Sequence, residues 1–251
     1  MKLEKIIGFL ENVAPVDIAM EYDNVGLLVG RWDKEVKKIV TALDCTLDVI
    51  HEAIAIGADL VVCHHPVMFG GVKKITDKTC EGEMLLLAIE NNIAIYAAHT
   101  NLDFAQGGLN DYFLEKLGYR ATDTIIDNEG RIFECGVTGR ELCQKIKQVF
   151  DIPYLRVNLD LDKVLLKGAV CTGSGKSLTG EVFDKADVYI TGDMGHHDIL
   201  TLAETGCGYI EISHYDSEKI VMELLEKILT EEFKDVEVYA SKENKNPLTI
   251  I

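Results

Sequence analysis

Side chains that could bind a metal ion are concentrated in four short segments of this sequence. Six of the seven histidines lie in these segments, and each segment directly follows an apolar run that is typical of a strand. Imidazole and carboxylate groups delivered from several strand ends are the usual components of an open divalent-metal site. The sequence therefore raises the question of which metal-dependent activity these residues serve. The segments are Cys63 to Pro66, His99 to Asp103, Gly192 to Asp198 and His214 to Glu218.

The first segment places two histidines side by side, His64 and His65, directly before Pro66. Neighbouring side chains of a regular strand point to opposite faces, so two adjacent histidines converge only where the strand ends. Proline supplies such an ending, because it cannot donate to a ladder and disfavours helix at the preceding residue. We predict that His64 and His65 are metal ligands. The alternative is one buried and one exposed histidine without a metal.

The second segment offers His99 and Asp103. Asp103 is predicted as a carboxylate ligand, with two alternatives: it could accept a hydrogen bond from an imidazole, or it could cap a helix. The sequence leaves three roles for His99: a ligand, a hydrogen-bond donor behind the ligands, or a proton-transfer group. We predict that His99 is a catalytic residue.

His214 and Glu218 in the last segment are spaced by four residues. If a helix begins near His214, both side chains lie on one face at its N-terminal end. They could then bind one ion together, or Glu218 could bridge two ions. The alternative is that Glu218 is an ordinary acid of a first helical turn.

Two weaker signals complete the set of candidates. His197 follows a glycine-containing loop and is interpreted as a residue that lines the site or acts as an acid or base. The run from 171 to 177 resembles the tail of a nucleotide-binding P-loop, but that motif requires glycine at position 170, which is Val170. We instead interpret Gly173 and Gly175 as a tight turn whose N–H groups could hold an anion.

The elements that must position these residues alternate along the chain. Strands separated by helices of this length indicate βαβ units and a mostly parallel sheet. The order of apolar strand, two histidines, helix, apolar strand and then histidine with an acid occurs in both halves. We therefore predict two lobes, residues 1–125 and 126–251, with the boundary in the polar stretch 119–131 and the last strand able to pack back on the first lobe. The predicted strands are 37–44, 58–64, 93–99, 131–138, 164–172, 186–191, 208–213 and 236–241, and the predicted helices are 2–12, 47–56, 80–92, 107–117, 139–150, 196–205 and 217–233.

Composition excludes several classes of protein. The 251 residues are 47% hydrophobic and 27% charged, and no apolar run approaches the ~20 residues of a membrane span. The N-terminal segment lacks the apolar core of a signal peptide, so we expect a cytoplasmic protein without a membrane partner. Seven scattered cysteines without a CxxC pair argue against a disulfide framework. The net charge of −17 disfavours nucleic acid as a partner but leaves room for a local anion pocket.

Taken together, the motifs resemble the NIF3-like family, whose bacterial members are commonly labelled GTP cyclohydrolase 1 type 2 homologues. Three departures stand out: Tyr22 in place of a usual tryptophan, Lys176 and Ser177 in a turn that is normally less charged, and Ser213 in place of a usual glycine. None of them removes a candidate ligand. The motifs that carry the resemblance are YDNVGLLVG (22–30), CHHP (63–66), AAHTNLD (97–103), CTGSGKS (171–177), ITGDMGHHD (190–198) and SHYDSEK (213–219).

The resemblance implies an α/β protein with two similar three-layer lobes, whose mostly parallel or mixed sheets face a central metal cleft. It also implies a ring-shaped homohexamer and two divalent ions per chain. His65 and Asp103 would hold one ion, His64 and His214 the other, and Glu218 would bridge both. Nitrogen and oxygen ligands leave zinc, iron, manganese, cobalt and nickel open.

Two functions follow from this resemblance. The first is a metal-dependent hydrolase that acts on a small nucleotide-like or phosphorylated, anionic molecule, with His99 or His197 transferring protons. The second is a non-catalytic protein that handles metal or takes part in regulatory interactions.

Overall fold

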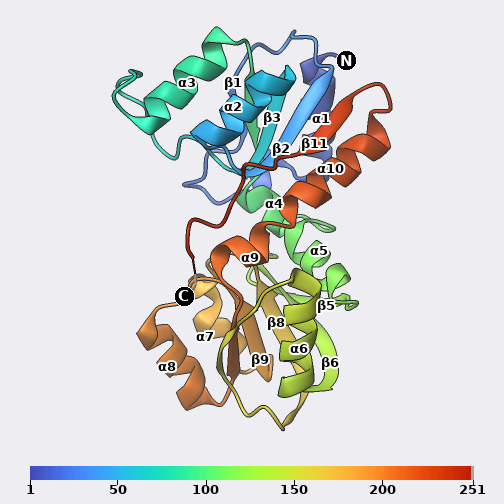
Figure 1. The fold of residues 1–251 in the computed structure, drawn as a ribbon. Helices are drawn as coiled ribbons and strands as arrows, with labels where there is room; N and C mark the ends of the chain where they lie inside the picture. Colours follow the sequence, from blue (N-terminus) through green and yellow to red (C-terminus); the bar gives the residue numbers. More distant parts are fainter. Residues whose placement is uncertain (250–251) are drawn as a thin grey trace. The chain divides into compact units, whose positions relative to one another are not determined.

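The computed structural model describes residues 1–249 and divides the chain into two compact units (Figure 1). The first unit is Met1–Leu102 together with the segment from Val221 onward, and the second is Asp103–Ile220. The predicted lobes divide the chain elsewhere, at 125/126. Residues 121–125 belong to the second unit because they pair antiparallel with 130–133. The last strand of the chain pairs in parallel with a strand near the N-terminus, as the sequence allowed, and so completes the first unit's sheet.

The first unit contains a five-stranded sheet in the order β1-β4-β3-β2-β11. Strands β4, β3, β2 and β11 run parallel to one another. Strand β1, at the edge of the sheet, pairs antiparallel with β4. The central strands are buried along nearly their whole length, as expected of a sheet covered on both faces. The strands are β1 (Gly26–Val29), β2 (Lys38–Asp44), β3 (Leu60–His65), β4 (Ala94–Ala97) and β11 (Glu237–Ala240).

Helices cover both faces of this first sheet. On one face α2 (Leu47–Ile56) and α3 (Cys80–Glu90) pack their buried side chains against Val61, Ile95 and their neighbours. On the other face lies α10 (Val221–Glu232), whose Met222 carbonyl accepts a hydrogen bond from Thr41 Oγ1 of β2 at 2.9 Å. The N-terminal helix α1 (Leu3–Val13) and the short helix η1 (Val16–Ile18) complete the unit. The result is a three-layer α/β arrangement.

The second unit contains a six-stranded mixed sheet in the order β5-β6-β8-β9-β10-β7. Strands β8, β9 and β10 are parallel to one another. Strand β6 pairs antiparallel with both β5 and β8, and β7 pairs antiparallel with β10. The strands are β5 (Ala121–Ile125), β6 (Gly130–Thr138), β7 (Arg156–Asn158), β8 (Val164–Cys171), β9 (Val188–Thr191) and β10 (Gly208–Glu211).

Helices pack on the second sheet as well. Tyr189 and Tyr209 share an apolar cluster with Val182 and Leu202, which come from α7 (Thr179–Val182) and α8 (His196–Thr205). The amphipathic helix α6 (Gly139–Phe150) buries one face and begins with a capping box. The remaining helices are α4 (Thr100–Phe104), α5 (Leu109–Lys116), η2 (Lys176–Leu178) and α9 (His214–Glu218).

The predicted mixed α/β class is confirmed, and most predicted elements are present. Helices α2, α6 and α8 begin and end at the predicted residues. The single helix predicted over 217–233 is wrong, because α9 ends at Glu218 and α10 begins at Val221. The polar stretch 119–131 holds β5 and the turn into β6, so it is a hairpin rather than a boundary. Strands β1, β5 and β7 were missed, since they are short or mostly exposed.

Among residues 1–249, no helix is both long and apolar enough to cross a membrane.

Candidate metal centre

Three imidazoles meet at the carboxyl ends of two adjacent parallel strands in the first unit. His64 and His65 end β3, and His99 follows the end of β4. Each ring contributes a nitrogen, and these three nitrogens lie within 4.8 Å of one another. The ring centroids are 5.2 Å apart for His64 and His65, 5.2 Å for His64 and His99, and 5.5 Å for His65 and His99. Strand ends of this kind are where open α/β sheets place their ligands.

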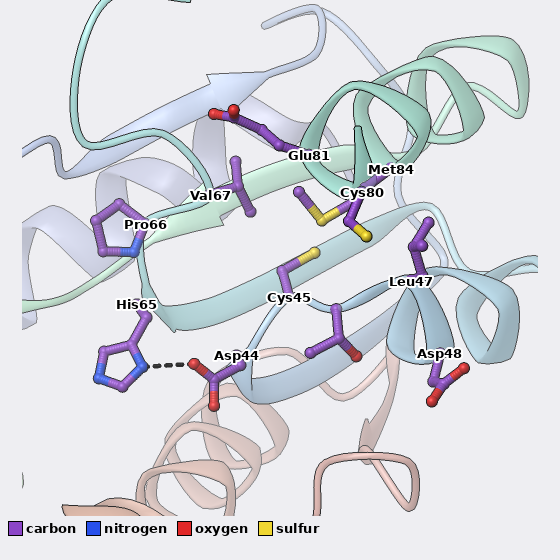
Figure 2. A pocket seen from close by; sticks show the side chains of 11 residues that line it. Asp44, Cys45, Leu47, Asp48, His65, Pro66, Val67, Cys80, Glu81 and Met84 are labelled. Atoms are coloured by element: carbon purple, nitrogen blue, oxygen red, sulfur yellow. Dashed lines mark hydrogen bonds and ion pairs between the residues drawn. The ribbon is translucent and has the colours of Figure 1, made fainter. Parts of the chain in front are cut away.

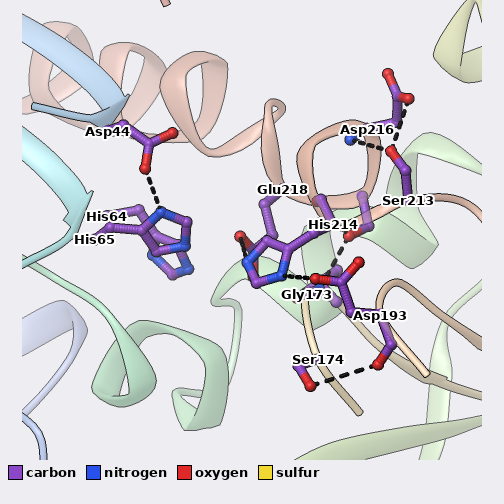
Figure 3. Close-up of polar contacts among 12 residues, drawn as sticks. Asp44, His64, His65, Gly173, Ser174, Asp193, Ser213, His214, Asp216 and Glu218 are labelled. Atoms are coloured by element: carbon purple, nitrogen blue, oxygen red, sulfur yellow. Dashed lines mark hydrogen bonds and ion pairs between the residues drawn. The ribbon is translucent and has the colours of Figure 1, made fainter. Parts of the chain in front are cut away.

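The Nδ1 atom of each ring faces an oxygen acceptor. His64 Nδ1 lies 2.7 Å from the Ala98 carbonyl oxygen, and His65 Nδ1 lies 2.7 Å from Asp44 Oδ1 (Figure 3). In a neutral ring that donates from Nδ1, the lone pair is on Nε2, and an acceptor behind the ring fixes the orientation of a metal-binding histidine. The donor set and its supporting acceptors therefore fit a divalent metal ion.

His99 is held by a carboxylate that the sequence analysis did not single out. Both oxygens of Asp23 lie 2.9 Å from His99 Nδ1, and Asp23 also accepts from the Thr100 N–H at 3.1 Å and from Thr100 Oγ1 at 2.5 Å. Burial alone would raise the pKa of Asp23, but the hydrogen bonds from His99 and Thr100 together with the charge of His99 hold that pKa well below its usual range. Asp23 is thus a buried anion that positions His99. Its place in the YDNVG motif was the available signal.

We expect Asp23→Asn to lower the free energy of unfolding at pH 7 by about 2 kcal/mol, the usual contribution of charge-assisted hydrogen bonds. Because the folded pKa of Asp23 is depressed, its stabilisation is present above the unfolded pKa of about 4 and is lost as pH falls toward the folded value. The difference in the free energy of unfolding between wild type and variant should therefore become smaller below pH 4. Urea unfolding at pH 7 and at pH 3 measures it, and an unchanged difference at both pH values would contradict this role.

In the second unit, α9 begins at His214, as the four-residue spacing required. Ser213 caps this helix, with its Oγ accepting from the Asp216 N–H at 3.1 Å, and adopts φ +62°. That left-handed value explains why glycine suits the position before His214. His214 Nε2 lies 3.0 Å from Glu218 Oε2, and its Nδ1 lies 3.1 Å from Asp193 Oδ2 (Figure 3). The imidazole therefore lies between two carboxylates.

Glu218 is buried, with 4% of its side chain exposed. Burial, followed by the nearby charges of Asp103 and Glu129, raises the pKa of the Cys171 thiol, and Glu218 adds to the effect. The negative charges of Asp103 and Glu218 thus act on the same buried thiol of the second unit. The buried Glu218 carboxylate beside His214 Nε2 provides an oxygen and a nitrogen that fit a cation. Asp103 itself is half-buried in α4, and its carbonyl oxygen accepts from Asn110 Nδ2 at 3.2 Å.

The glycine-rich turn lies against the His214–Glu218 pair. A Cβ on Gly173 would be 2.0 Å from Glu218 Oε1 and 3.4 Å from His214 Nε2. The N–H groups predicted to hold an anion have other acceptors: Gly173 N–H donates to Ser217 Oγ and Gly175 N–H to Thr191 Oγ1, both at 2.9 Å. An anion would have to displace these hydroxyls. The turn provides close approach to the carboxylate.

Other predicted residues of the second unit lie on its surface. His197 is exposed near the start of α8, and the centroid of its ring lies 5.4 Å from that of the His196 ring. Lys176 and Ser177, the two departures in the glycine-rich turn, both interact with carboxylates: Lys176 Nζ lies 3.8 Å from Asp198 Oδ2, and Ser177 Oγ donates to Glu129.

Comparison with known proteins extends these observations to the whole chain. A sequence model of the family described as Duf34/NIF3 (NGG1p interacting factor 3) matches residues 1–247. The chain belongs to the Duf34/NIF3 family. One relative of this Duf34/NIF3 chain is the GTP cyclohydrolase 1 type 2 homolog of Clostridium perfringens. The two sequences are 38% identical over 262 aligned residues, which cover all of both chains.

Solved structures of the Duf34/NIF3 fold agree. Staphylococcus aureus protein SA1388 has a TM-score of 0.92 at 28% identity and covers 100% of this chain and 99% of its own. Reduced HcgD from Methanocaldococcus jannaschii has a TM-score of 0.86 at 33% identity, covering 96% of this chain and 98% of its own. The resemblance drawn from the motifs is therefore confirmed, together with the fold.

Proposed function

We propose that this protein is a metal-dependent hydrolase that binds two divalent ions and acts on a small nucleotide-like or phosphorylated molecule. The observation that carries the proposal is the group formed by His64, His65 and His99, with an oxygen acceptor at every Nδ1. His64 and His65 are oriented as metal ligands, His99 lies beside them, and a packed core does not require such an arrangement.

The ligand set that the resemblance implies adds Asp103, His214 and Glu218 to His64 and His65. Divalent ions held by these residues supply Lewis acidity and lower the pKa of water toward neutrality. His99 would take up and return a proton at Nε2, because the carboxylate of Asp23 holds its Nδ1 and fixes the orientation of the ring. The exposed position of His197 gives it no comparable partner, so His99 is the stronger candidate for proton transfer.

The name of the Clostridium perfringens relative suggests GTP as the first substrate to test. Purified protein loaded separately with Zn²⁺, Mn²⁺ and Fe²⁺ should turn over GTP or another nucleotide, and Glu218→Ala should lower the rate by at least about a hundredfold, the scale on which disrupted metal sites lose activity. Glu204→Ala on the exposed face of α8 is the matched control. Liquid chromatography of the products measures turnover. Absence of turnover with every metal and nucleotide would count against the hydrolase.

A non-catalytic role in metal handling or regulation is the second candidate. The family description names an interacting factor, and the same ligands would retain ions without any reaction. Metal bound at full occupancy with no turnover in a broad substrate screen would favour this role. The resemblance also leads us to propose a ring-shaped homohexamer, which native mass spectrometry tests.

A further inference from the structure

A cavity of about 560 Å³ lies beside His65 in the first unit (Figure 2). Its walls come from the end of β2, the start of α2, the segment that follows β3 and the start of α3. Cavities of this volume accommodate small organic molecules. All of its lining residues belong to the first unit, so the cavity is a property of that unit alone.

The walls of the cavity are largely apolar and contain sulfur. Cys45 is 8% exposed and Met84 is 6% exposed, and Leu47 and Val67 line the cavity with them. Thioether and aliphatic groups make favourable contacts with the faces and edges of planar rings. The chemistry of these walls therefore suits a flat, uncharged ring.

The charged groups of the cavity are carboxylates. Asp44, Asp48 and Glu81 line it, and none of its lining residues is lysine or arginine. Asp44 accepts from His65, whereas Glu81 extends from α3 toward the segment that carries Val67 (Figure 2). Ionised carboxylates accept hydrogen bonds from ring N–H and amino groups and repel phosphate. The cavity thus discriminates between the two ends of a nucleotide.

We propose that this cavity binds the nitrogen-heterocycle portion of the substrate, an uncharged ring carrying N–H or amino donors, and does not bind its phosphate groups. The inference rests on the proposed function, because His65 both lines the cavity and belongs to the three-imidazole group. A ring held here lies beside a residue of the candidate metal centre. Phosphate groups would have to extend out of the cavity.

Cys80 provides a native reporter of occupancy. It is the first residue of α3, it lines the cavity, and it is the exposed cysteine of this chain. Of the other six cysteines, five are buried and Cys143 is half-buried. Burial, followed by the charge of Asp44, raises the pKa of the Cys45 thiol to about 12, so Cys45 stays protonated at pH 8. N-ethylmaleimide at pH 8 should therefore modify Cys80 first, and Cys80→Ser should remove that modification.

The test is protection of Cys80 in the full-length protein by guanosine and by ribose 5-phosphate, measured by mass spectrometry of the modified protein over time. Guanosine at ten times its Kd should slow the modification about tenfold by occupancy alone, and ribose 5-phosphate should leave the rate unchanged. Glu81→Gln should weaken protection by guanosine. Glu83→Gln should not, because Glu83 shares the first turn of α3 but does not line the cavity.

Protection by ribose 5-phosphate, or no protection by guanosine, would overturn the inference. The experiment needs neither turnover nor a bound metal, so its outcome is separate from that of the hydrolase assay. If the protein hydrolyses nucleotides but guanosine does not protect Cys80, the proposed function stands and this inference is wrong. Protection of Cys80 without turnover leaves the cavity as a ring-binding site and removes the hydrolase.

Discussion

His64→Ala and His65→Ala are each expected to reduce metal affinity by at least about a hundredfold, because even the groups that orient metal ligands cost tenfold to a hundredfold when they are lost. Both rings are held by acceptors at Nδ1, so the folded protein presents the ligand nitrogens already oriented. Metal content after loading and desalting, measured by inductively coupled plasma mass spectrometry, gives the result without reference to any activity.

His51→Ala is the matched control for these variants. His51 is exposed on α2 and is the one histidine outside the four ligand segments. Its replacement should leave the metal content at the wild-type value. If His64→Ala and His65→Ala also kept the wild-type content while remaining folded by circular dichroism, the candidate centre would be wrong.

His99→Ala separates two roles within the same group. We expect this variant to retain metal and lose turnover. The ligand set implied by the resemblance does not include His99, and Asp23 holds its Nδ1 so that Nε2 is the atom that would transfer a proton. A loss of metal as large as that in His64→Ala would instead make His99 a ligand, and the proton-transfer role would be withdrawn.

The sequence predicted the parts of the fold in which local pattern and tertiary packing agree. Helix α2 is an example: Thr46 caps it, an apolar stripe follows, and Gly57 ends it with φ +69°. Strand β11 shows the limit. The sequence predicts a strand over 236–241, and the structure has it over Glu237–Ala240, but only the parallel pairing with β2 assigns it to the first unit. Pairing across about 200 residues depends on long-range packing that a local pattern does not encode.

The candidate site shows the same distinction. The His64-His65-Pro66 run predicted a strand end, and β3 ends at His65. Asp44 and Asp23 were missed because an acid at the end of a strand or in a loop has many ordinary uses. Only the structure reveals that each accepts a hydrogen bond from the Nδ1 of a candidate histidine. The hydroxyl acceptors of the Gly173 and Gly175 N–H groups were not predicted for a related reason, since they come from 44 and 16 residues away.

Gly173→Ala is expected to destabilise the second unit by about 3 kcal/mol or more, through steric overlap in addition to the cost of a left-handed conformation. Gly173 has φ +67°, and the added Cβ would lie 2.0 Å from Glu218 Oε1. The carboxylate would have to move, and with it the contact between His214 Nε2 and Glu218 Oε2. We therefore expect weaker metal binding in the same variant. Urea unfolding measures the stability, and metal content measures the effect on the centre.

Two other glycines of the second unit serve as controls that separate the steric overlap from the cost of the left-handed backbone. Gly107 has φ +76° with no atom within 4 Å of an added Cβ, so Gly107→Ala should show only the conformational cost of about 1–2 kcal/mol. Gly180 lies in α7 with an ordinary φ and equal space, so Gly180→Ala should be neutral or stabilising by up to about 1 kcal/mol. The excess of Gly173→Ala over Gly107→Ala measures how closely the turn packs against Glu218. Equal losses in these two variants would mean that the carboxylate moves aside freely and that Gly173 serves the backbone alone.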